Sequence, residues 1–114
     1  DVSMTVFLSE PEEYDGGELV IATEFGQQHI KLPAGYAVVY PSSSLHKVTA
    51  VTRGQRIAAI TWMQSMVADV TLRQTLYQLD QSIQNLIKAE HTDRAELDNL
   101  HNVYHNLIRQ FTQL

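Results

Sequence analysis

The hydrophobic period of this chain changes once, near Gln64 and Ser65, and this change limits the possible folds more than any other feature. Before it, short β-branched and aromatic runs alternate with turn residues, whereas after it apolar residues recur every three or four positions. A period of two is typical of β-strands, and a period of 3.6 is typical of α-helices. We therefore expect strands over residues 1–63 and helices over residues 64–114.

The expected strands are short, rich in β-branched and aromatic residues, and separated by segments with glycine, proline or serine. They cover residues 2–8, 18–23, 28–32, 36–40, 46–51 and 55–63, with turns at 11–17, 24–26, 33–35, 41–44 and 53–54. Proline and glycine favour turns through a fixed φ and through tolerance of positive φ. Short strands at this spacing predict an antiparallel sandwich or jelly roll.

Two apolar helical stripes follow. The first contains Leu72, Leu76, Leu79, Ile83 and Leu86, and the second contains Leu97, Leu100, Tyr104, Leu107, Phe111 and Leu114. Between them Asp93, followed by Glu96, resembles a capping box at a helix start. The pattern predicts a helical hairpin.

Composition excludes several classes of function. The 114 residues contain no cysteine, so disulfides, thiolate zinc sites and cysteine nucleophiles are impossible. The net charge is −5 and the basic residues are scattered, which disfavours nucleic-acid binding. No stretch approaches the ~20 apolar residues of a membrane span, so we expect a soluble, cytoplasmic protein. The chain begins at Asp1 directly within an apolar alternation, so we expect a trimmed start.

The segment from Tyr40 to Arg56 contains the strongest candidates for chemistry. A turn leads into a strand that begins at His46, and a hairpin at residues 53–54 would return the chain at Arg56, placing both side chains on paired strands. Arg56, Ala58, Ile60 and Trp62 would share one face. A lone strand histidine is more often structural than a ligand, and a lone arginine more often forms a surface salt bridge.

Several motifs in order resemble the PKHD-type hydroxylases, bacterial relatives of the prolyl hydroxylases. They lie at residues 14–21 (YDGGELVI), 31–35 (KLPAG), 40–46 (YPSSSLH), 51–56 (VTRGQR), 62, 79–80 and 103–109. The resemblance covers essentially the whole chain. It implies a partial double-stranded β-helix over residues 1–63, followed by a C-terminal helical hairpin over residues 64–114.

The resemblance also implies an iron(II)- and 2-oxoglutarate-dependent dioxygenase, with ascorbate as a further candidate cofactor. By matching position, His46 would be the distal histidine ligand of the iron, and Arg56 would hold the far carboxylate of 2-oxoglutarate. Leu19 and Trp62 would wall the cosubstrate pocket. The family's other two iron ligands form a His-x-Asp pair, which this sequence does not contain. We therefore expect the C-terminal portion of such an enzyme, catalytically incomplete by itself, with an unknown substrate.

Other sites have weaker support. His101 and His105 are four residues apart but lack the intervening glutamate of a His-Glu-x-x-His zinc site, and His29 alternates with apolar residues as an outward side chain would. Residues 15–17 (Asp-Gly-Gly) lack a phosphate-loop lysine and predict a tight turn. The serines at 42–44 lack a nucleophile elbow and an orienting acid, which disfavours a hydrolase.

Two functions remain as alternatives to an oxygenase. A cupin-like ligand-binding module would keep the barrel without catalysis. A homo-oligomerisation module would act through the apolar stripes of the helical hairpin.

Overall fold

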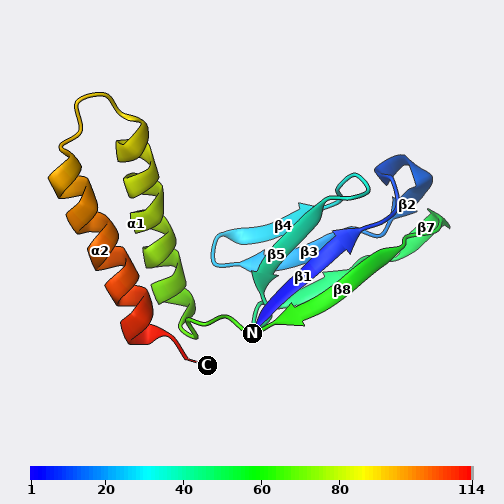
Figure 1. The fold of residues 1–114 in the computed structure, drawn as a ribbon. Helices are drawn as coiled ribbons and strands as arrows, with labels where there is room; N and C mark the ends of the chain where they lie inside the picture. Colours follow the sequence, from blue (N-terminus) through cyan, green and yellow to red (C-terminus); the bar gives the residue numbers. More distant parts are fainter. Residues whose placement is uncertain (114) are drawn as a thin grey trace. The chain divides into compact units, whose positions relative to one another are not determined.

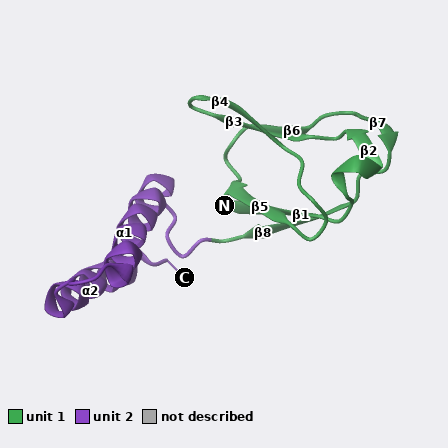
Figure 2. Cartoon of the chain, turned by 90° about the horizontal axis from the view of Figure 1, so that it is seen from above, with its two compact units in different colours: residues 1–64 green, residues 65–114 purple. Residues whose placement is uncertain are grey.

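The chain divides into two compact units, residues 1–64 and 65–114, which Figure 2 shows in different colours. The computed structural model describes residues 1–113. The expected stripe residue Leu114 lies outside the described residues. Strands occupy the first unit and two helices occupy the second (Figure 1).

The first unit contains eight strands and one short 3₁₀ helix. These are β1 (Val2–Phe7), η1 (Pro11–Glu13), β2 (Tyr14–Gly16), β3 (Leu19–Thr23), β4 (Gly26–Ile30), β5 (Ala37–Pro41), β6 (His46–Val48), β7 (Val51–Gly54) and β8 (Ala58–Met63). All strand pairs are antiparallel, in the orders β5-β1-β8, β4-β3-β6 and β2-β7. Figure 2 shows the two three-stranded sheets as separate layers. The predicted fold class, a partial double-stranded β-helix followed by helices, is confirmed.

The expected hairpin at residues 53–54 is wrong. Residues 51–54 form β7 and pair with β2. β2 lies within residues 11–17, for which the sequence predicted only a turn. Two glycines with positive φ allow this close pairing, because a Cβ on Gly16 would overlap the Ala50 carbonyl and one on Gly54 would overlap the Glu13 carbonyl. β6 pairs instead with β3, and β8 with β1, so His46 does not share a strand pair with Arg56.

The inner faces of the two three-stranded sheets meet in a small apolar core. Leu19 and Ile21 of β3 pack with Tyr40 of β5, and Ile30 and Val38 lie against this cluster. On β1 the buried side chains alternate with partly exposed ones. The buried set is Ser3, Thr5 and Phe7, so two hydroxyl groups of the central strand face inward.

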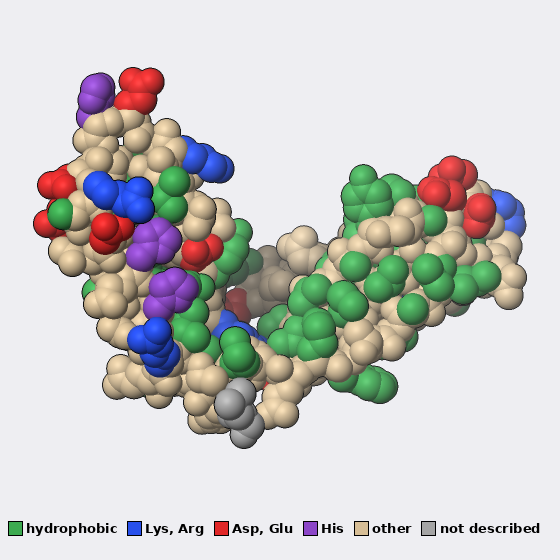
Figure 3. All heavy atoms as spheres, viewed as in Figure 1, with side chains coloured by type: hydrophobic (Ala, Val, Ile, Leu, Met, Phe, Trp, Pro, Cys, Tyr) green, Lys and Arg blue, Asp and Glu red, His purple; other side chains and the backbone are tan. Residues whose placement is uncertain are grey.

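The outer face of the β5-β1-β8 sheet is largely apolar. The strand register places on it Val2, Met4, Val6, Ala37, Val39, Ala59, Thr61 and Met63. Figure 3 shows hydrophobic side chains spread over the face that this sheet presents in Figure 1. Val39 is 56% exposed. No element of the first unit covers this face.

The second unit is a helical hairpin of α1 (Val70–Lys88) and α2 (Arg94–Phe111) (Figure 1). Asp69 caps α1 by accepting from the Leu72 N–H, and Asp93 caps α2 by accepting from the Ala95 N–H, so the predicted start of the second helix is confirmed. An antiparallel bridge between Val67 and Thr112 joins the two ends of the hairpin.

The predicted stripes provide the contact between the helices, but only in part. The most buried side chains are Leu76, Ile83 and Leu97, whereas Leu86 and Phe111 are exposed at the edges of their stripes. Neither helix, within residues 1–113, combines the length and apolar character needed to cross a membrane.

Candidate functional site

A cavity of 160 Å³ lies within the strand unit and is lined by both three-stranded sheets. Its lining residues include Leu19, His46, Arg56 and Trp62, the four residues that the sequence analysis selected. Ser3, Thr5, Tyr40, Lys47, Val48 and Ile60 complete the lining. The structure therefore brings all four candidates to one cavity, although they come from three different segments of the chain.

His46 begins β6, directly opposite Ile21 of β3. Because cross-strand partners share a face, its imidazole lies on the same side of the sheet as Leu19 and Ile21. The ring meets Tyr40 edge-on, with 5.0 Å between the ring centroids. Its Nδ1 lies 2.7 Å from the carbonyl oxygen of Ser44. Since a carbonyl only accepts, Nδ1 donates in this contact, and in the neutral form of the ring the free lone pair is on Nε2.

Arg56 lies between β7 and β8, outside any strand, and reaches the cavity from there. Its guanidinium carbon lies 5.6 Å from the centroid of the Phe7 ring. Nε and Nη2 have essentially no accessible surface and no hydrogen-bond partner among residues 1–113. Each buried donor without a partner disfavours the folded state by about 1–3 kcal/mol. A ligand with a hydrogen-bond acceptor would therefore be stabilised next to Arg56.

The period-two face predicted for the last strand is consistent with the lining. Arg56, Ile60 and Trp62 all contribute to the cavity, while Ala58 is partly buried on the same side of β8. Trp62 is 75% exposed, so the cavity is open at this end.

Ser3 and Thr5 line the cavity from β1 and were not selected from the sequence. Each is 2% exposed. The Ser3 hydroxyl lies 2.7 Å from that of Ser42. The sequence signal for these two residues is the alternation of residues 2–7, in which hydroxyl side chains occupy every second position before Phe7. The same alternation also fits a strand with an exposed polar face, so it could not identify a site.

An ion pair links the short strands β2 and β7. Arg53 Nε donates to Asp15 at 2.8 Å, and Arg53 Nη2 donates to the Glu12 carbonyl at 2.9 Å. The hydrogen bond from Arg53 is the main cause that lowers the pKa of Asp15 below its ordinary value; burial opposes it, and the positive charges of Arg53 and Lys31 add to the lowering. The same pair raises the pKa of Arg53. Both side chains are exposed, so the pair fixes geometry more than it adds stability.

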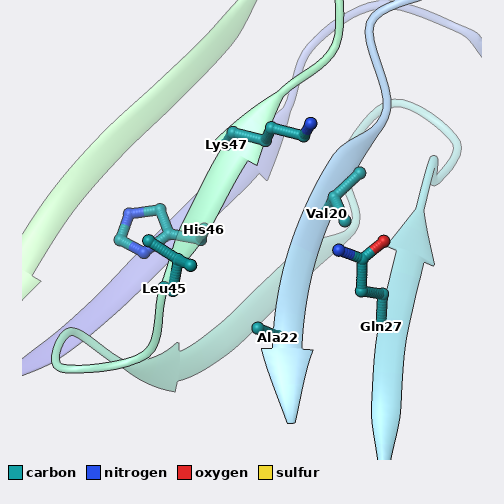
Figure 4. Close-up of a pocket in the computed structure, with 6 residues that line it drawn as sticks. All are labelled: Val20, Ala22, Gln27, Leu45, His46 and Lys47. Carbon is teal, nitrogen blue, oxygen red and sulfur yellow. The ribbon is translucent and has the colours of Figure 1, made fainter.

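A second hollow, of 180 Å³, opens on the other face of the β4-β3-β6 sheet and is drawn in Figure 4. Val20, Ala22, Gln27, Leu45 and Lys47 line it together with His46. In Figure 4 the imidazole of His46 turns away from Val20 and Gln27. The hollow is mainly apolar and Arg56 does not line it, so we assign the candidate chemistry to the 160 Å³ cavity.

The weaker candidates lie elsewhere. His29 is exposed on β4, with Nδ1 3.2 Å from Glu18, and the rings of His101 and His105 stack on α2 with centroids 6.2 Å apart. A hydrolase triad would require a contact between the His46 ring and a serine hydroxyl, but the ring contacts the Ser44 carbonyl instead. Within residues 1–113, no three His, Cys, Asp or Glu side chains are grouped as metal ligands.

Known proteins resemble this chain over both units. Residues 1–64 match the family model of the 2OG-Fe(II) oxygenase superfamily, and residues 71–113 match that of the PKHD-type hydroxylase C-terminal domain. A PKHD-type hydroxylase of Shewanella frigidimarina is 97% identical over 114 residues, and one of Alteromonas mediterranea is 63% identical over 114 residues. One of Teredinibacter turnerae is 57% identical over 113 residues.

These matches cover 99–100% of this chain and 50% of each relative, so the chain spans about half the length of these proteins. The two family models lie in the same order along the chain as the strand unit and the helical hairpin. The chain therefore belongs to the 2OG-Fe(II) oxygenase superfamily and, within it, to the PKHD-type hydroxylases.

Proposed function

We propose that this chain provides the cosubstrate-binding arginine and one iron ligand of an iron(II)- and 2-oxoglutarate-dependent hydroxylase. One observation carries the proposal: Arg56, two of whose buried donors have no partner among the described residues, lines a cavity that His46 also lines. In such enzymes the iron and the cosubstrate together supply the decarboxylation of 2-oxoglutarate to succinate, coupled to hydroxylation of a substrate C–H bond. The substrate is not specified by these residues.

The cavity suits a carboxylate at Arg56. A guanidinium presents parallel N–H groups that match the two oxygens of a carboxylate, and such charge-assisted bonds are about twice as strong as neutral ones. A carboxylate would satisfy the donors of Nε and Nη2, which have no partner in the described part of the chain. In this proposal Leu19 and Trp62 wall the pocket and orient the dicarboxylate.

The donor set at His46 suits a metal ligand. Histidine ligands usually donate their second ring N–H to a carbonyl or carboxylate, which fixes the ring and its tautomer. The contact from Nδ1 to the Ser44 carbonyl has this form and leaves Nε2 for the metal. Iron in such oxygenases takes two histidines and one carboxylate. The chain offers His46 alone in this cavity, so the His-x-Asp pair that its sequence lacks would complete the site.

The first experiment uses this chain with iron(II) and 2-oxoglutarate. We expect weak 2-oxoglutarate binding by calorimetry, nearly independent of anaerobic iron(II), and no succinate above a blank in air, with or without ascorbate. One histidine cannot impose the arrangement that leaves adjacent sites for oxygen and cosubstrate. Strong iron-dependent binding, or turnover that His46→Ala abolishes, would show that the chain assembles a complete site.

The second experiment uses the Shewanella frigidimarina relative, with substitutions at the positions equivalent to those of this chain. His46→Ala should abolish succinate release while leaving the melting temperature nearly unchanged. Arg56→Lys should chiefly raise the 2-oxoglutarate concentration required, because a point charge replaces a bidentate fork. His29→Ala, on the exposed face of β4, is the matched control. Unchanged succinate release by the His46 variant would exclude the proposed ligand.

Exposed apolar side chains favour one of the two alternatives, a homo-oligomerisation module. On the helical hairpin Val70, Tyr77, Ile87 and Val103 are 44–65% exposed. Exposed apolar patches are typical of subunit interfaces. Light scattering on a size-exclusion column distinguishes the two functions, because a monomer that retains 2-oxoglutarate binding supports the oxygenase, while a stable oligomer without such binding supports the alternative.

A further inference from the structure

Gly17 leaves the space that the aliphatic part of Arg56 occupies. A Cβ built on Gly17 would lie 3.1 Å from Cδ of Arg56, and 3.0 Å from both Cε2 of Tyr14 and Cγ2 of Val51. Gly17 is also buried, with φ +64°. Any side chain at this position would therefore be strained and would press on three neighbours, one of which is the stem of Arg56.

Phe7 borders the charged end of the same side chain. It lies at the end of β1, is 1% exposed, and places its ring centroid 5.6 Å from the guanidinium carbon of Arg56. A guanidinium within about 6 Å of a ring centroid is attracted by the negative charge density of the ring face. The ring therefore restrains the group without using its N–H donors.

Hydrogen bonds do not fix the orientation of the Arg56 guanidinium at two of its three nitrogens, because Nε and Nη2 have no partner among the residues that the structure describes. The backbone of Arg56 lies between strands, and hydrogen bonds hold the next residue in place. The Ile57 N–H donates to Ser9 Oγ at 2.9 Å, and the Ile57 carbonyl accepts from the Leu8 N–H at 3.0 Å. The side chain itself is restrained by packing, with Gly17 beside its stem and Phe7 beside its guanidinium.

We propose that Phe7 and Gly17 are positioning residues, which hold the guanidinium of Arg56 in place before a dicarboxylate arrives. The inference rests on the proposed role of Arg56. Preorganisation of this kind strengthens binding because less side-chain freedom is lost when the ligand binds. It also leaves the Nε and Nη2 donors unpaired until an acceptor enters the cavity.

The test follows the Arg56 side chain by NMR in the ¹⁵N-labelled chain. The ¹⁵N–¹H heteronuclear NOE of the Arg56 Nε–H group, assigned by its loss in Arg56→Lys, reports the rigidity of the guanidinium. A titration with 2-oxoglutarate, followed through the same signal, reports binding. Phe7→Leu removes the ring face but keeps an apolar side chain, and Gly17→Ala fills the space beside the stem.

Each variant has a matched control. Gly35→Ala introduces the same kind of backbone strain at φ +87°, with nothing within 4 Å of the added Cβ, and keeps the N–H that bonds to the Phe7 carbonyl. Val20→Ala truncates a residue that is 3% exposed and lies on the other face of β3. Both controls should lower the melting temperature without altering the Arg56 signal.

We expect a rigid Arg56 side chain in the wild type, a lower NOE in Phe7→Leu and Gly17→Ala, and 2-oxoglutarate binding weakened about 3- to 10-fold in both. An unchanged NOE, or an unchanged affinity despite a lower NOE, in folded Phe7→Leu overturns the inference, and this variant decides the matter if Gly17→Ala does not fold. If 2-oxoglutarate does not shift the wild-type signal at all, the proposed role of Arg56 fails, while the NOE comparison still tests the positioning.

Discussion

Replacement of Arg56 by methionine should stabilise the strand unit while abolishing its affinity for dicarboxylates. The two unpaired donors of Arg56 each disfavour the folded state by about 1–3 kcal/mol, and the contact with Phe7 offsets about 0.5–2 kcal/mol of this. Methionine keeps a flexible apolar stem and brings no donors. We therefore expect the free energy of unfolding to rise by about 1–3 kcal/mol.

Urea unfolding followed by tryptophan fluorescence reports on the strand unit, because the single tryptophan of the chain, Trp62, lies on β8. The matched control is Arg53→Met, which removes an arginine whose donors are satisfied by Asp15 and the Glu12 carbonyl, and should not stabilise. Saturating 2-oxoglutarate should raise the urea midpoint of the wild type and leave that of Arg56→Met unchanged. A clear loss of stability in Arg56→Met would refute the reasoning, because it would mean that the Arg56 donors are satisfied in the folded protein.

Three further results are expected. Ile83→Ala, at a position 1% exposed on α1, should lower the free energy of unfolding of the hairpin by about 2–5 kcal/mol, measured by the helical circular dichroism signal during denaturation. Ile87→Ala, at a half-exposed position, should lower this free energy much less, and equal losses would contradict the assigned packing. Asp15→Asn should lower the melting temperature near neutral pH, and because pairing with Arg53 depresses the Asp15 pKa, the difference from wild type should vanish as pH falls through that depressed value; a difference independent of pH would contradict the ion pair. His46→Ala should leave the urea midpoint nearly unchanged but remove any broadening of cavity resonances by a paramagnetic divalent ion, and persistence of that broadening would assign the metal elsewhere.

Resemblance to a known family identified the candidate residues, and the structure added how they meet. The motif at residues 40–46 and 51–56 selected His46 and Arg56, whereas the local pattern joined them through a hairpin that does not exist. A hairpin prediction uses only the propensities of a few neighbouring residues. Those propensities cannot show that a distant strand, β2, supplies the partner of β7.

The sequence by itself determined the change from strands to helices, the start of α2 at Asp93 and the fold class, because period, capping and ordered motifs are local properties. Only the tertiary structure decided that Ser3 and Thr5 face inward and that the donors of Arg56 have no partner. These facts depend on contacts between segments about 40–50 residues apart, and a strand face of mixed polarity fits either side of a sheet until the opposing sheet is in place.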